Sequence, residues 1–217
     1  MSSFALVNIL GGLLIITSTI VVLAKNARTS AFLYSAQSFV LVVMFVALAT
    51  ATGSTELYLW SVSAFFTKVL LVPAILLFTL KKIGNHSAEL GSRLTPAKSL
   101  ALVAFEVLIC IVAVQGIDLP TAAAVKPALA ISLAHFFIGL TCIISQRNIM
   151  KQVFGYCLME NGAHVSLALL APQAPELVEV GIATDAIFAV LVMVIMILRI
   201  YRVTNTLDAR DLSDLKG

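Results

Sequence analysis

Residues 180–202 read VGIATDAIFAVLVMVIMILRIYR, an apolar run that contains one acid and ends on a pair of arginines. A helix needs about 20 mainly apolar residues to cross the hydrocarbon core of a bilayer. This stretch is long enough, with Asp185 inside it and with Arg199 and Arg202 near its end. We therefore predict a transmembrane helix that carries a carboxylate between its ends.

Six more apolar stretches of similar length precede this one. Only 12% of the 217 residues are charged, whereas a soluble domain carries about 25%, and the mean hydropathy is +1.05. These values exclude a water-soluble enzyme and a disordered chain, and they leave little sequence for a domain outside the membrane. We predict an all-α, polytopic integral membrane protein with seven transmembrane helices at residues 4–24, 30–52, 57–80, 99–117, 128–146, 150–171 and 180–202.

The placement of basic residues predicts the orientation of these helices. Twelve of the 14 Lys and Arg residues lie in or beside the connections on one side of the membrane, or at the end of the last helix. The opposite side has Lys126 and four acids, Glu56, Asp118, Glu176 and Glu179. Because cytoplasmic connections are enriched in Lys and Arg, we expect a periplasmic N-terminus and a cytoplasmic C-terminus. The uncharged N-terminus runs directly into the first helix, so we expect that helix to be retained as an anchor.

A faint internal repeat divides the chain. When the first three predicted helices are shifted by 122 positions, Lys25-Asn26 falls on Arg147-Asn148 and Tyr34 falls on Tyr156. This pattern is typical of a duplicated three-helix unit whose two copies have the same orientation. We predict a first unit at 1–82, a cytoplasmic loop with a linking helix at 83–127, a second unit at 128–203 and a solvent-exposed cytoplasmic tail at 204–217.

Six ionisable residues lie away from the ends of the predicted helices, although a charge at mid-bilayer costs about 2.5–3.5 kcal/mol on insertion scales. Such residues persist where water, a partner side chain or another subunit compensates them. Titratable groups buried in this way are suited to relaying protons. The candidate relay residues are Lys68, Glu106, His135, Glu160, His164 and Asp185.

Three of these candidates lie in the last two predicted helices. Glu160 and His164 are four residues apart and share one helix face, where a carboxylate and an imidazole can exchange a proton through water. Alternatively, each of them binds a neighbouring helix. Asp185 lies about five residues into its predicted helix, where it faces a partner subunit or extends toward the membrane interface.

The other three candidates lie in separate helices. Lys68 is near the middle of its helix, and Pro73 leaves the Val69 carbonyl without its helical donor, so that a water path can run there. Glu106 needs protonation or a charged partner, and its simplest partner is Lys68, in a structural ion pair. His135 is the one candidate on its helix, and a packed, hydrogen-bonded histidine is its commoner role.

The three cysteines, Cys110, Cys142 and Cys157, lie in apolar stretches at spacings that do not suit zinc or iron–sulfur ligation. We interpret them as small apolar residues in helix packing. We therefore expect no metal or cofactor in this chain. Its expected partners are the lipid bilayer and other membrane subunits, not nucleic acid.

Residues 128–202 resemble the three-helix K subunit of respiratory complex I and its relative in multisubunit sodium/proton antiporters. The matching features are Arg147-Asn148 at the start of a helix, Gly155, Asn161, and an acid in the next helix, Asp185. At one position the chain departs from the complex I pattern, because the first family carboxylate falls on Cys157. The resemblance implies that this carboxylate has moved one turn along the helix, to Glu160, and that Asp185 replaces the second.

The whole chain resembles the hydrogenase-4 component E family of formate hydrogenlyase-type complexes. The residues that carry this resemblance are SQRNIMKQVFGYCLMENGAH at 145–164, ELVEVGIATDAIFAV at 176–190 and FFTKVLLVPAILL at 65–77. The resemblance implies a non-catalytic subunit in the bacterial cytoplasmic (inner) membrane, attached to a group 4 nickel–iron hydrogenase. Such a subunit helps to couple hydrogen chemistry to the translocation of protons or sodium ions.

The same resemblance implies antiporter-like subunits as neighbours, and nickel–iron and iron–sulfur centres in partner subunits, because this chain lacks the thiolates to bind them. A structural adaptor between antiporter-like subunits and a subunit of a multisubunit cation/proton antiporter are the alternatives. A freestanding transporter or a retinal receptor fits less well, since the last helix has no lysine and Trp60 is the single tryptophan.

Overall fold

The computed structural model describes residues 3–84, 92–118 and 120–213, and these residues form helices joined by short connections. This confirms the predicted all-α class. The helices are α1 (Ser3–Leu23), α2 (Ala27–Thr52), α3 (Thr55–Ala64), the π-helical segment η1 (Phe65–Leu71), α4 (Val72–Ile83), α5 (Pro96–Gln115), the 3-10 segment η3 (Pro120–Val125), α6 (Lys126–Ser145), α7 (Ile149–Leu170), α8 (Glu176–Thr204) and α9 (Ala209–Ser213).

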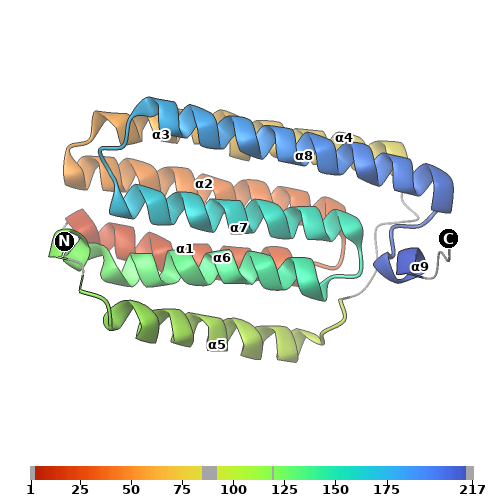
Figure 1. Cartoon of the computed structure of the whole chain (residues 1–217), viewed down its shortest axis with the longest axis horizontal. Helices are drawn as coiled ribbons and strands as arrows, with labels where there is room; N and C mark the ends of the chain where they lie inside the picture. The colour runs from red at the N-terminus through yellow and green to blue at the C-terminus, as the bar shows by residue number, and fades with distance from the viewer. Residues whose placement is uncertain (1–2, 85–91, 119, 214–217) are drawn as a thin grey trace.

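The long helices lie side by side along the long axis of the molecule, and the chain begins and ends at opposite ends of the bundle (Figure 1). Helix α1 contacts α6, α2 contacts α7, and both α3 and α4 contact α8. Each helix of the first half therefore lies against a helix of the second half. Helix α5 lies at the edge, where it contacts α6 and α1. We call the end where α1, α4, α6 and α8 finish the basic end.

Asparagine caps begin two of the central helices. The side chain of Asn26 accepts a hydrogen bond from the backbone N–H of Arg28 at the start of α2. Asn148 accepts in the same way from Met150 at the start of α7. Both satisfy a backbone donor that has no partner within its helix, and they occupy matching positions in the predicted repeat.

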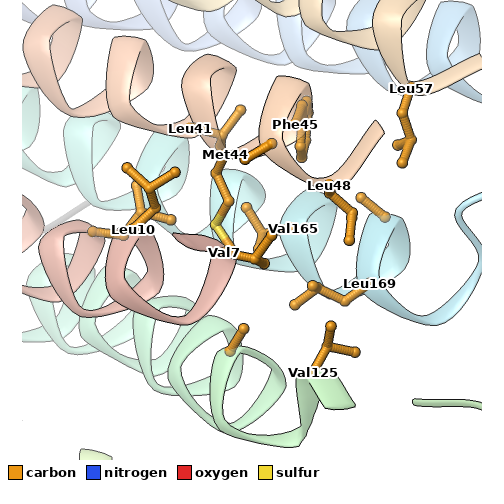
Figure 2. Packing of buried hydrophobic residues seen from close by; sticks show 14 of the residues in the cluster. Val7, Leu10, Leu41, Met44, Phe45, Leu48, Leu57, Val125, Val165 and Leu169 are labelled. Atoms are coloured by element: carbon orange, nitrogen blue, oxygen red, sulfur yellow. The ribbon is translucent and has the colours of Figure 1, made fainter. Parts of the chain in front are cut away.

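One of two buried hydrophobic clusters lies where α1, α2 and α7 meet, and Figure 2 shows their side chains converging. Val7 of α1, Leu41 and Met44 of α2, and Val165 of α7 are almost completely buried. Burial of such side chains away from lipid depends on packing, because lipid tails are as apolar as the core itself.

Glycines bring α6 and α7 unusually close together. A Cβ atom on Gly139 of α6 would lie 2.3 Å from the backbone nitrogen of Met159, and one on Gly162 of α7 would lie 2.4 Å from that of Phe136. No side chain fits at those distances without a shift of the backbone. Small residues of this kind allow membrane helices to gain van der Waals contact, and here they fix α7 in the centre of the bundle.

Six stretches among the described residues are helical, long and apolar enough to cross a membrane: α1, α2, α3–η1–α4 taken together, α5, α6 with the end of η3, and α8. Helix α7 is not among them, although it has 22 residues. It carries Lys151, Glu160, Asn161 and His164, which lower its hydropathy. The helices around α7 give these polar groups partners that lipid could not.

Two boundary predictions need correction. Helix α8 begins at Glu176 and not near residue 180, so Asp185 lies nine residues inside it and not about five. The predicted tail is not solvent-exposed throughout, because Leu207 and Asp208 are only 1% and 4% exposed. The middle of the predicted loop after α4, residues 85–91, and the last residues of the tail, 214–217, lie outside the described residues.

Candidate functional site

The centre of the candidate site is an ion pair between η1 and α7. The ammonium nitrogen of Lys68 donates to Oε1 of Glu160 at 2.5 Å and also contacts the second carboxylate oxygen. The side chain of Lys68 is 1% exposed and that of Glu160 is 13% exposed. Two opposite charges thus compensate each other inside the bundle, and the Glu160 side chain remains partly exposed.

Amide side chains extend this pair toward α2. Lys68 also donates to Oδ1 of Asn161 at 2.9 Å. The amide nitrogen of Asn161 donates to Gln37 Oε1 at 3.0 Å and to Ser38 Oγ at 3.3 Å. Lysine, carboxylate, amide and hydroxyl groups from three elements therefore form one connected polar network, and such networks polarise one another in a low dielectric.

The π-helical turn and Pro73 shape the backbone beside Lys68. The N–H of Val72 bonds to the carbonyl of Thr67, five residues earlier, in place of the usual four. Pro73 has no N–H for the carbonyl of Val69, and the hydroxyl of Ser35 donates to that carbonyl at 2.8 Å. The predicted free carbonyl is thus satisfied by α2. A π-helical turn of this kind occurs often at functional sites.

A second ionisable pair joins α7 to α8. Nε2 of His164 lies 2.7 Å from Oε2 of Glu179, and the two side chains are 0% and 3% exposed. The contact has the distance of an ion pair, but its atoms are not aligned as a hydrogen bond. The imidazole also lies against two aromatic rings, with centroid distances of 4.7 Å to Phe45 and 5.4 Å to Trp60.

The structure overturns one predicted pairing and bears on a second. Lys68 pairs with Glu160 and not with Glu106, whose carboxylate accepts a hydrogen bond from Thr141 of α6. Glu160 and His164 share a helix face, but they contact different neighbours, Lys68 and Glu179. The alternative, that each binds a neighbouring helix, is the one the geometry supports.

Sequence reasoning missed Glu179. It appeared to be an acid outside the membrane, because the predicted helix began after it. Helix α8 begins three residues before Glu179, and its carboxylate faces inward. The spacing offered a signal, since Glu179, Ala183, Ala186 and Val190 fall on one helical stripe, and all four are buried.

Two further candidates lie on other elements. His135 of α6 is fully buried, and its ring lies 3.3 Å from the hydroxyl of Ser18 on α1. This supports the predicted packed histidine. Asp185 is exposed on the outer face of α8. The side chain of Tyr156 on α7 lies close enough to interact electrostatically with both Asp185 and Glu160.

The basic end is held by contacts that fix the start of α7. Lys151 is only 2% exposed and donates to the carbonyls of Val21 and Ala24 at the end of α1. A lysine at a helix C-terminus satisfies carbonyls that lack a helical donor. The guanidinium of Arg147 makes a bidentate ion pair with the carboxylate of Asp208. This pair holds the segment after α8 against the α6–α7 connection.

The cysteines and acids of the described residues form no metal site. Cys110, Cys142 and Cys157 are all free and buried. No group of three or more His, Cys, Asp or Glu side chains in residues 3–84, 92–118 and 120–213 is arranged to hold a metal ion. Three ion pairs form within this part of the chain: Lys68–Glu160, Arg147–Asp208 and His164–Glu179.

Comparison with known proteins bears on what these pairs do. The family model of the NADH-ubiquinone/plastoquinone oxidoreductase chain 4L matches residues 127–217. Hydrogenase-4 component E of Escherichia coli strain K12 is 50% identical over 186 residues, which is 86% of both chains. The chain belongs to the hydrogenase-4 component E family. The same protein from Escherichia coli O157:H7 and from Shigella flexneri gives the same identity and coverage.

The component E relatives confirm the resemblance of the whole chain, and the chain 4L family model confirms that of its C-terminal part. The matched 127–217 region contains α6, α7 and α8, and hence Glu160, His164, Glu179 and Asp185. Lys68 lies outside it. The Lys68–Glu160 pair therefore joins the chain 4L-like part of this component E relative to its N-terminal part. No solved structure matches the chain with significance.

Proposed function

We propose that the chain is a non-catalytic membrane subunit of a group 4 nickel–iron hydrogenase of the hydrogenase-4 or formate hydrogenlyase type. In this role it helps to couple hydrogen chemistry to the movement of protons or sodium ions. Its relatives are named as hydrogenase-4 components, and its C-terminal part resembles a chain of a respiratory oxidoreductase. The reacting metal centres belong to other subunits of that complex.

The proposed arrangement in the membrane has seven crossings. Helix α7 has 22 residues and a length of about 33 Å, enough to span a hydrocarbon core of about 30 Å. The excess of Lys and Arg at the basic end favours placing that end in the cytoplasm. The chain then lies in the bacterial inner membrane with its N-terminus in the periplasm.

The observation that carries the coupling proposal is the buried network of Lys68, Glu160, Asn161 and Gln37. A proton or cation that arrives near Glu160 weakens the attraction between Glu160 and Lys68. The change in charge is then felt at α2, η1 and α7 together, because all three elements contribute to the network. A π-helical turn at Lys68 supplies a backbone that can adjust to such a change.

Asp185 extends this proposal to neighbouring subunits. A carboxylate on an outer helix face costs about 2.5–3.5 kcal/mol in lipid, and a basic or polar group of an adjacent subunit removes that cost. Antiporter-like subunits with lysines buried in the membrane are partners of the right chemistry. Glu160, Tyr156 and Asp185 then lead from the buried network to the subunit interface.

Two single substitutions test this function in the intact hydrogenase complex. Glu160→Gln and Asp185→Asn are expected to reduce proton movement per hydrogen formed, measured in membrane vesicles with a pH-sensitive dye. Hydrogen production by the solubilised complex should remain. The relay role fails if both variants move protons at the wild-type ratio.

The exposed position of Asp185 also favours a second function, that of a structural adaptor between antiporter-like subunits. In that case Asp185→Asn weakens assembly and leaves the ratio unchanged in complexes that do assemble. Blue-native electrophoresis of the same membranes separates the two functions. A chain that co-purifies with antiporter subunits and without a hydrogenase would indicate a multisubunit cation/proton antiporter.

A further inference from the structure

A group of polar atoms without partners lies beside the His164–Glu179 pair. Both ring nitrogens of His164, both carboxylate oxygens of Glu179 and the indole nitrogen of Trp60 are buried, and none has a hydrogen-bond partner among the described residues. Trp60 is 0% exposed and His164 is 1% exposed. A buried polar atom left without a partner costs roughly 1–3 kcal/mol, and a proton placed between Nε2 of His164 and Oε2 of Glu179 removes that cost for these two atoms.

The chemistry of these side chains suits a shared proton. An imidazole and a carboxylate 2.7 Å apart can share a proton between nitrogen and oxygen. An alkali cation suits them poorly, because such ions prefer several oxygen ligands and the site offers a single carboxylate. The aromatic walls from Phe45 and Trp60 also suit an imidazolium, whose charge is attracted to the faces of the rings.

We propose that His164 and Glu179 together hold one exchangeable proton against the indole of Trp60, at the end of the bundle opposite the basic end. When the site loads, a proton from water adds to a ring nitrogen of His164, and the resulting imidazolium neutralises the Glu179 carboxylate. Transfer within the pair breaks the Nε2–H bond and forms an O–H bond on Glu179. When the site unloads, the same proton returns to water.

The other charged groups near this site lie on the same packed helices. Glu160 is one turn away on α7 and is already paired with Lys68 of η1. Glu56 and Glu176 lie in the first turns of α3 and α8. Asp185 lies on the outer face of α8, and His135 of α6 is engaged with Ser18 of α1. The Glu179 carboxylate is therefore the acid in direct contact with His164.

Trp60 offers a built-in probe, because it is the only tryptophan in the chain. A protonated imidazole in contact with an indole quenches its fluorescence. We expect the emission of the purified full chain in lipid nanodiscs to fall in one transition as the pH is lowered from about 8 to about 5, where histidine changes its charge. Sodium chloride exchanged for potassium chloride at constant ionic strength should leave the emission unchanged.

Three variants make the assignment specific. His164→Gln should abolish the transition, and Glu179→Gln should alter it, because the carboxylate in contact with His164 is gone. His135→Gln is the matched control and should leave the transition in place. Circular dichroism of each variant checks that the helices are retained.

The proposal is overturned if the wild-type emission shows no transition, if the transition survives in His164→Gln, or if sodium ions reproduce it. The measurement uses the chain alone and detects no ion transport. It can therefore succeed or fail independently of the coupling role proposed for Glu160 and Asp185.

Discussion

Helices α5 and α7 are of similar length, with 20 and 22 residues, and their surroundings are opposite. Helix α5 is apolar, lies at the edge of the bundle and exposes Phe105, Leu108 and Val112. Its one acid, Glu106, contacts a threonine hydroxyl on α6. Helix α7 is too polar to count among the helices that are apolar enough to cross a membrane. It lies at the centre of the bundle, where four long helices contact it.

The difference shows that the hydropathy of a helix depends on what surrounds it. A helix in contact with lipid must be apolar, whereas one surrounded by other helices can carry charges that those helices compensate. The polar residues of α7 each have a partner on another element: Lys151 on α1, Glu160 on η1 and His164 on α8. Substitutions in the two helices should therefore differ in cost.

The largest expected effect comes from breaking the central pair. Lys68→Met leaves the Glu160 carboxylate buried without its cation, and loss of one partner of a buried ion pair costs about 3–5 kcal/mol. The loss of folding stability can be measured by unfolding the purified chain in mixed micelles to which a denaturing detergent is added. In α5 the matched change Glu106→Gln removes a carboxylate that has no cation, and it should cost less than about 1 kcal/mol. Equal costs would contradict the comparison.

The next effect concerns the close contact of α6 and α7. Gly139→Ala places a methyl group against the backbone of Met159, and overpacking of this kind costs about 1–3 kcal/mol. Gly181→Ala in α8 meets nothing within 4 Å, so higher helix propensity should stabilise it by about 0.5–1 kcal/mol. The same unfolding assay should give changes of opposite sign. Two destabilised variants would show that the space around Gly181 is not open.

A smaller effect is expected at the Val69 carbonyl. Ser35→Ala removes the hydroxyl that replaces the donor missing at Pro73, and it should cost about 1 kcal/mol. Thr184→Val is the control, because the Thr184 hydroxyl bonds to a carbonyl of its own helix. If the two substitutions have the same effect, the Ser35 contact does not stabilise the π-helical turn.

The smallest effect lies at the basic end and depends on pH. Hydrogen bonds from Arg147 lower the pKa of Asp208 from its ordinary value of 3.8. A carboxyl group with a lowered pKa in the folded state stabilises the fold above its ordinary pKa, and this stabilisation is lost as the pH falls below that value. Stability of the wild type should therefore decrease below about pH 4.

In Arg147→Gln the loss of stability at acid pH should be smaller than in the wild type. Arg202→Gln, at an exposed position near the end of α8, should lose stability at acid pH as the wild type does. Unfolding measured at a series of pH values tests both variants. If Arg147→Gln loses as much stability at acid pH as the wild type, Asp208 is not the group that causes the loss.

The sequence predicts the helices and the ionisable residues well, and it predicts their partners poorly. Apolar length locates each helix to within about four residues, because the bilayer imposes that length directly. The pairing of Lys68 with Glu160 could not be predicted, since it depends on α2, η1 and α7 being neighbours. The burial of Glu179 was missed because helix α8 begins before the apolar run from which it was predicted.

The central claim is that the Lys68–Glu160 pair takes part in coupling and does more than hold α7 in place. The double substitution Lys68→Gln with Glu160→Gln tests it, because it leaves no unpaired charge and so separates coupling from stability. Proton uptake per hydrogen formed should be measured in vesicles that contain equal amounts of assembled complex. The account predicts an assembled, hydrogen-producing complex with a reduced ratio, and a wild-type ratio would contradict it.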